Sequence, residues 1–206
     1  VESPSSPGVN RALEQIRAYT PDVVVVEDSA LQAHRPNALG LTSDGVIYLS
    51  DAIPEELSVV VPSHEIVHAL KQSNNKNYLN FMETVGESIS FDGDPTGVLD
   101  VVIESRYPGK TLFDLSMKEL DTVYDELNAL VWGYHKADPE HARAQFAGVF
   151  RDYDAYIRAL DGIMEGAAKR EGDTPNPGAG PEYLTGPESS VGGAREGFDP
   201  WSRSRW

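Results

Sequence analysis

The chain has 206 residues, a formal net charge of −16, 40% apolar residues and no cysteine. This length and composition fit one globular domain with a core of its own, or such a domain with a tail. The negative charge argues against binding to nucleic acid or to an anionic membrane, and the lack of cysteine excludes disulfides, thiolate metal ligands and cysteine nucleophiles.

The first fifty residues predict a short helix and a small sheet. Residues 1–8 are rich in serine, proline and glycine, so we expect them to be flexible. Residues 10–19 have the apolar spacing of a short amphipathic helix. Three segments then have the composition of strands, the first of them expected to be buried: 23–26, 38–41 and 46–49. Between the last two, Asp44-Gly45 is typical of a hairpin turn.

The next segment predicts a helix that carries two histidines one turn apart. It is strongly apolar and contains the sequence His64-Glu65-Ile66-Val67-His68. Residues at positions i and i+4 share a helix face, about 6 Å apart, so both imidazoles can reach one metal ion. Pro62 lies just before the motif, so the helix either kinks or begins at that residue.

The motif also places a carboxylate beside the histidine pair. A Zn²⁺ ion with three protein ligands keeps a position open for water and lowers the pKa of that water to about 7. A neighbouring carboxylate can then accept the proton at neutral pH, so Glu65 is the predicted general base. Five-residue patterns of this kind also occur by chance, but polar groups buried in an apolar segment need a partner, and a metal ion supplies one.

Beyond the motif the sequence is typical of helices joined by turns. Residues 78–90 predict a helix, and turns are expected at 92–95 and at 107–109. Ser116 followed by Glu119 is a capping box, which predicts the start of a long helix.

The end of the chain divides into a helix and a tail. Asp138-Pro139 predicts the cap and first turn of a last helix, which we expect to run without a break to about Lys169. Residues 172–200 contain seven glycines and five prolines, a composition that cannot build a core. We therefore divide the chain into a flexible start, a folded domain and a disordered tail or linker: 1–8, 9–170 and 171–206.

Two histidines leave a zinc site one protein ligand short, and a carboxylate on a later helix is expected to complete it. Glu83 and Glu87 lie on the helix after the motif, where a helical hairpin would bring either one to the depth of the histidines. Glu126 lies on the capped helix with Ala129 and Gly133 at helical spacing, and such small residues let two helix backbones approach closely. We favour Glu126 and keep the other two as alternatives.

Residues close to Glu126 in the sequence are candidates for supporting roles. Asp125 is a candidate acceptor for the ring N–H of a ligand histidine, although exposure to solvent is the favoured interpretation. Tyr124, Tyr134 and His135 are candidates for stabilising an oxyanion, although a core or surface role is favoured for each of them.

Three segments together resemble the zincin metallopeptidases, and the gluzincin branch in particular: Val46–Leu49, Ser63–Leu70 and Glu126–Ala129. In that family two histidines and a later glutamate bind zinc, and the glutamate inside the motif is the base. The resemblance implies that His64, His68 and Glu126 are ligands and that Glu65 is catalytic. It also implies an α+β, zincin-like fold, in which a small N-terminal sheet packs on the motif helix and a mostly helical part follows.

A second similarity is to metallopeptidase-like domains of large polyvalent proteins of prophages and mobile elements. Four segments carry it: Val61–Glu65, Tyr78–Phe81, Tyr124–Ala129 and Phe150–Tyr156. This similarity implies that other modules of a larger parent protein are partners. The start of the chain lacks an initiator methionine and the apolar core of a signal peptide, and no apolar run has the length of a membrane span. We expect a bacterial or phage-associated domain in the cytoplasm.

These observations lead to three hypotheses for function. The first is a zinc endopeptidase, in which an extended peptide or protein substrate pairs with an edge strand at 46–49 and Glu65 deprotonates the attacking water. The second is a catalytically silent binding or structural module that keeps the fold without turnover. The third is a zinc amidase or another hydrolase with the same ligands and a different substrate.

Overall fold

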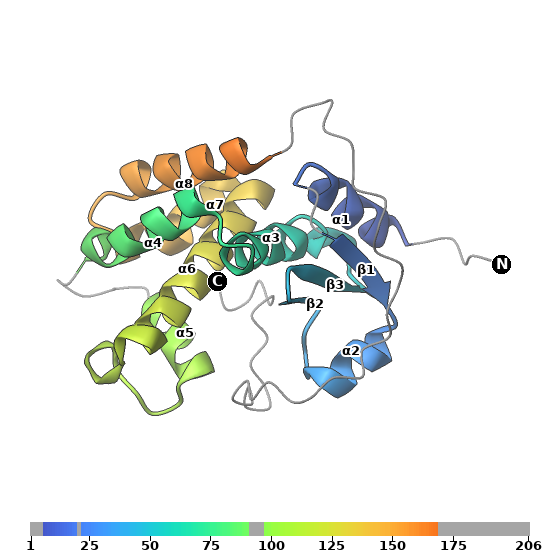
Figure 1. Ribbon diagram of the computed structural model, residues 1–206, viewed down its shortest axis with the longest axis horizontal. Coiled ribbons are helices and arrows are strands. Elements are labelled where there is room, and N and C mark those ends of the chain that lie inside the picture. The colour runs from blue at the N-terminus through green and yellow to red at the C-terminus, as the bar shows by residue number, and fades with distance from the viewer. Residues whose placement is uncertain (1–5, 20–21, 91–96, 169–206) are drawn as a thin grey trace.

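The computed structural model describes residues 6–19, 22–90 and 97–168 (Figure 1). Within these ranges the protein is mixed α+β and mostly helical, with one small sheet, so the expected fold class is confirmed at this level. The expected turn at 92–95 and the expected tail at 171–206 lie outside the described residues. The segment 1–8 was predicted to be flexible, but helix α1 (Pro7–Arg17) already begins at Pro7, where the side chain of Ser6 accepts from the backbone N–H of Val9.

The sheet has three strands: β1 (Asp22–Val26), β2 (Gly40–Ser43) and β3 (Val46–Ser50). Their order is β1-β3-β2, with β1 parallel and β2 antiparallel to β3. Asp44 and Gly45 connect β2 to β3 with φ angles of 51° and 79°. Positive φ at both central residues is the requirement of a tight hairpin turn, so the predicted hairpin is confirmed.

Two expectations about the sheet were wrong. Residues 46–49 were predicted to offer a free edge to substrate, but β3 is the central strand and has a partner on each side. Residues 23–26 were expected to be buried, but Val24 and Val25 are 38% and 39% exposed because β1 is an edge strand. A run of valines is compatible with both positions, so composition did not decide between them.

Helix α3 (Val60–Gln72) carries the histidine motif and lies between the sheet and the helices that follow it in the chain (Figure 1). It packs against α1, β2 and β3 on one side and against α6 (Met117–Ala137) on the other. The helix begins two residues before Pro62, which therefore stands in the first turn, where its missing N–H has no partner in the helix to lose. Almost every residue from Val60 to Ala69 is buried, because both faces of the helix are covered.

After α3 the described chain consists of helices and short turns, and it matches the predicted elements only in part. The capping box of Ser116 and Glu119 is present and starts α6. The predicted long last helix is wrong: it divides into α7 and α8, because Asp152 caps a new helix through the N–H of Ala155. Helices α2 and α5 were not predicted. The remaining helices are α2 (Asp28–His34), α4 (Lys76–Ser88), α5 (Val98–Arg106), α7 (Pro139–Phe146) and α8 (Tyr153–Ala167), with short 3-10 turns η1 (Glu55–Leu57), η2 (Leu112–Asp114) and η3 (Ala147–Val149).

Candidate metal centre

Three side chains with metal-binding atoms converge where α3 meets α6: His64, His68 and Glu126. The two Nε2 atoms of the histidines are 3.0 Å apart. One carboxylate oxygen of Glu126 lies 3.3 Å from Nε2 of His64, and the other lies 3.4 Å from Nε2 of His68. The side chains of His64 and Glu126 are only 4% and 8% exposed. The structure therefore brings the two motif histidines and the favoured third residue together.

Small residues on α6 allow this approach. A Cβ atom added to Gly133 would lie 2.8 Å from the backbone oxygen of Val60 and 3.5 Å from Cβ of His64. Real side chains do not tolerate the first of these distances, so α3 and α6 touch backbone to backbone at this point. Ala129, between Glu126 and Gly133 on the same helix, is fully buried. The stripe of small residues next to the candidate ligand thus has the predicted role.

The chemistry and spacing of these donors fit a zinc ion. Zinc takes imidazole nitrogen and carboxylate oxygen at about 2.0–2.2 Å in a tetrahedral arrangement, which places neighbouring ligand atoms about 3.3 Å apart. The separations of 3.0, 3.3 and 3.4 Å are close to this value. Three protein ligands are the number found in catalytic zinc sites, in which the fourth position stays open.

A buried chain of hydrogen bonds fixes the orientation of His68. Its Nδ1 lies 2.6 Å from Oδ2 of Asp125, and the other oxygen of that carboxylate accepts from the hydroxyl of Tyr78 at 2.7 Å. Asn128 donates to the Tyr78 hydroxyl at 3.2 Å and accepts from the hydroxyl of Tyr156 at 2.6 Å. These hydrogen bonds connect α3, α6, α4 and α8. Because Nδ1 donates to Asp125, Nε2 is the nitrogen that faces the centre.

The favoured interpretation of Asp125 as an exposed residue was wrong. Its side chain is 10% exposed and bonds to the imidazole, as the alternative interpretation had it. Burial by itself would raise the pKa of Asp125, but the charge and hydrogen bond of His68 hold that pKa below its ordinary value. Burial by itself would lower the pKa of His68, but Asp125 and Glu126 together raise it from 6.5 to about 10. In the metal-free protein at neutral pH, His68 is therefore protonated.

We expect Asp125→Asn to lower the affinity for zinc by about 10-fold to 100-fold, because the carboxylate that orients the imidazole is lost. In the wild type, zinc must displace the proton from Nε2 of His68, so affinity rises with pH until the pKa near 10 is passed. Calorimetry in buffers of different ionisation enthalpy measures this release, which we expect to be about one proton per zinc at pH 7 and less in the variant.

Asp121→Asn is the matched control, since Asp121 also lies on α6 but is half exposed and pairs with Lys71 at 2.6 Å. It should bind zinc as the wild type does. Equal affinity and equal proton release in the wild type and Asp125→Asn would contradict the positioning role.

The raised pKa of His68 also predicts how the stability of the metal-free fold depends on pH. The ion pair of protonated His68 contributes fully below pH 6.5, and its contribution is lost as the pH rises through about 10.

Glu65 follows His64 on α3, and its side chain is held by the edge strand β2. The hydroxyl of Thr42 lies 2.7 Å from Oε2 of Glu65 and 3.0 Å from its backbone oxygen. Gly40, on the same strand, leaves room for the carboxylate, because an added Cβ would stand 2.9 Å from Cγ of Glu65. Glu65 is 3% exposed. The sequence did not single out Thr42 or Gly40, since their role depends on the packing of β2 against α3.

Two arginines that sequence reasoning missed stand next to this cluster. Arg106, at the end of α5, forms an ion pair with Glu126 through Nη2. Arg35, just after α2, lies within electrostatic range of Arg106, Glu126 and Glu65. Burial by itself would raise the pKa of Glu126, but Arg106 and His64 hold it well below its ordinary value. The carboxylate is therefore ionised and available to a cation.

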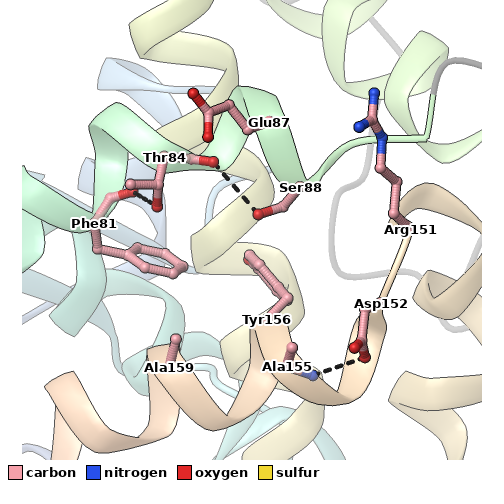
Figure 2. Close-up of a pocket in the computed structure, with 9 residues that line it drawn as sticks. All are labelled: Phe81, Thr84, Glu87, Ser88, Arg151, Asp152, Ala155, Tyr156 and Ala159. Atoms are coloured by element: carbon pink, nitrogen blue, oxygen red, sulfur yellow. Dashed lines mark hydrogen bonds between the residues drawn. The ribbon is translucent and has the colours of Figure 1, made fainter.

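The other candidates from the sequence lie elsewhere. Glu83 and Glu87 are exposed on α4 and do not belong to the metal-binding group found among the described residues. Glu87 instead borders a pocket of about 280 Å³ between α4 and α8 (Figure 2). The hydroxyl of Tyr124 faces Gly86 on α4, as shown by the 3.1 Å that would separate it from an added Cβ. The two remaining oxyanion candidates contact other aromatic residues: Tyr134 packs on Phe146 and His141, and His135 on Trp132.

Comparisons with family models, curated proteins and solved structures found no match to this chain. Among the described helices, none combines the length and the apolar character needed to cross a membrane.

Proposed function

We propose that the protein is a zinc-dependent metallopeptidase of zincin type, with His64, His68 and Glu126 as ligands and Glu65 as general base. The observation that carries this proposal is the convergence of a His/His/Glu donor set whose two histidines lie on a helix that also holds the buried carboxylate of Glu65, directly after His64. Asp125 accepts a hydrogen bond from Nδ1 of His68, and Thr42 donates a hydrogen bond to the carboxylate of Glu65. Donor set, orienting carboxylate and base are the parts that a hydrolytic zinc site needs.

The residues of the chain divide the chemistry between them. A zinc ion bound here would polarise the scissile carbonyl and make water acidic enough to lose a proton near pH 7. Glu65 accepts that proton and later delivers it to the leaving amine. The hydroxyl of Thr42 keeps the carboxylate of Glu65 in place beside the ligands. Since β2 is the edge strand that touches Glu65, an extended peptide adds to the sheet at β2 and not at β3.

We expect Glu65→Gln to lower peptide hydrolysis by about 100-fold to 10,000-fold, because the amide cannot accept a proton. Zinc content should stay at one ion per chain, since Glu65 is not a ligand in this proposal. The measurement combines elemental analysis of the purified protein with cleavage of a pooled peptide library followed by mass spectrometry. Glu87→Gln is the control, because Glu87 is exposed and borders the pocket between α4 and α8.

One observation favours the alternative of a catalytically silent module. The buried charges already have partners within the protein: His68 pairs with Asp125, and Glu126 with Arg106. A fold that satisfies these groups by itself can persist without a metal. This alternative is correct if the wild type binds no zinc, or if it binds zinc and cleaves neither peptides nor small amides. Cleavage of small amides without cleavage of peptides would indicate the amidase.

A further inference from the structure

Two cationic side chains lie close to the candidate metal centre, one at the end of α5 and the other just after α2. Arg106 ends α5, which packs on α6, and Arg35 follows α2, which leads into β2. Figure 1 shows α2 and α5 on the same side of α3, one next to the sheet and the other next to α6. Both guanidinium groups lie within electrostatic range of Glu65 and Glu126. They therefore lie close to the place where a substrate would meet the base and the ligands.

The two arginines differ in how their charges are satisfied. Arg106 has its ion pair with Glu126. Arg35 is half-buried, and within the described part of the chain its guanidinium forms no hydrogen bond or ion pair. Burial lowers the pKa of Arg35, and the charge of Arg106 lowers it further. The nearby carboxylates of Glu126 and Glu65 partly oppose this effect, but neither accepts a hydrogen bond from Arg35 within the described residues, so its guanidinium can still bind an anion.

The charges of the residues at the centre predict the charge of the group that it would bind. Glu65 and Glu126 lie within electrostatic range of both arginines, and Asp125 lies within range of Arg106, so two guanidinium groups and three carboxylates surround the centre. A zinc ion with two neutral imidazoles adds two positive charges, so the loaded centre has one net positive charge. The whole chain has a formal charge of −16, so this centre is a local exception on an acidic protein. A site of this kind attracts an anionic group and repels a second cation.

We propose that Arg35 and Arg106 bind a carboxylate of the substrate beside the bond to be cleaved. The proposal rests on the proposed function and names its substrate class. A guanidinium has five N–H donors in a planar fork, so Arg106 can keep Glu126 with Nη2 and still donate to a second carboxylate. Arg35 donates to the same substrate carboxylate with N–H groups that form no hydrogen bond within the described residues. The carboxylate is either the C-terminus of a peptide or the side chain of an acidic residue.

The first experiment measures carboxylate binding without turnover. Monohydroxamates of dicarboxylic acids, with two to five methylene groups, anchor to zinc at one end and present a carboxylate at the other. Their amides are the uncharged partners. Calorimetry on the zinc-loaded protein should show that the acid binds about 10-fold to 100-fold more tightly than the amide at one chain length. Arg35→Gln should remove this preference without loss of zinc, and the exposed Arg158→Gln on α8 should retain it.

The outcomes separate the two proposals. If acid and amide bind equally at every chain length, the carboxylate site does not exist, while the metal site stands. If no hydroxamate binds at all, the metal site itself is wrong and both proposals fail. If Arg35→Gln keeps the full preference for the acid, Arg35 is not part of the site and the proposal is overturned.

The second experiment identifies the source of the carboxylate. A degenerate peptide library is prepared with free C-termini and again with amidated C-termini, and both forms are treated with the zinc-loaded wild type. Cleavage close to the C-terminus that disappears on amidation assigns the site to the terminal carboxylate. Cleavage that persists, with aspartate or glutamate enriched at one position, assigns it to an acidic side chain. Cleavage that is indifferent to both overturns the proposal.

Discussion

Glu126→Gln is expected to reduce zinc affinity by about 100-fold or more and to destabilise the metal-free fold by about 3 kcal/mol. The affinity falls because a neutral amide oxygen replaces one of three ligands. The stability falls for a separate reason: Arg106, whose side chain is 19% exposed, loses the carboxylate that compensates its charge. Removing one partner of a buried ion pair costs more than the pair contributes, because the other charge stays in a poorly solvated place.

Glu83→Gln is the matched control, since the sequence left Glu83 open as the third ligand and the structure exposes it on α4. Chemical denaturation of both variants in the presence of a chelator measures the effect of the ion pair alone, and titration with zinc measures the effect of the ligand. If Glu83→Gln loses zinc and Glu126→Gln keeps it, the assignment of the third ligand is wrong. If Glu126→Gln is as stable as the wild type without metal, the charge of Arg106 does not need Glu126 to compensate it.

The convergence of His64, His68 and Glu126 could be predicted from local regularities of the chain. Placing His64 and His68 on one face requires only the period of a helix. Glu126 was favoured over its competitors because Ala129 and Gly133 repeat on the same face, and a helix with small residues on one face is suited to close packing. Both arguments use spacings of three to seven residues, which the sequence displays directly.

The parts that were missed depend on contacts between segments far apart in the chain. The order β1-β3-β2 makes β3 central, and no local pattern in the run 46–49 encodes that order. Arg106 was missed because α5 has only nine residues and little amphipathic pattern to predict it. Tyr78 on α4 and Tyr156 on α8 join the hydrogen bonds around Asp125 and Asn128. In the sequence these two tyrosines cannot be told from ordinary core residues.

Gly133→Ala tests whether the close contact of α3 and α6 is what assembles the centre. Alanine is a better helix former than glycine, so helix propensity alone would stabilise the protein by about 0.5–1 kcal/mol. The added methyl group, however, would stand 2.8 Å from the backbone oxygen of Val60, which cannot rotate away as a side chain would. The helices must separate, and we expect a net loss of about 1–3 kcal/mol.

The same displacement should weaken zinc binding by about tenfold or more, because His64 moves with α3 and Glu126 with α6. Gly162→Ala is the control: Gly162 lies inside α8 with nothing within 4 Å of an added Cβ, so this variant should be slightly more stable and bind zinc normally. If the backbone contact sets the geometry, thermal denaturation will show a loss of stability for Gly133→Ala and a small gain for Gly162→Ala, and zinc titration will show weaker binding for Gly133→Ala alone. A Gly133→Ala protein that gains stability like Gly162→Ala and keeps its zinc would show that the ligands converge without that contact.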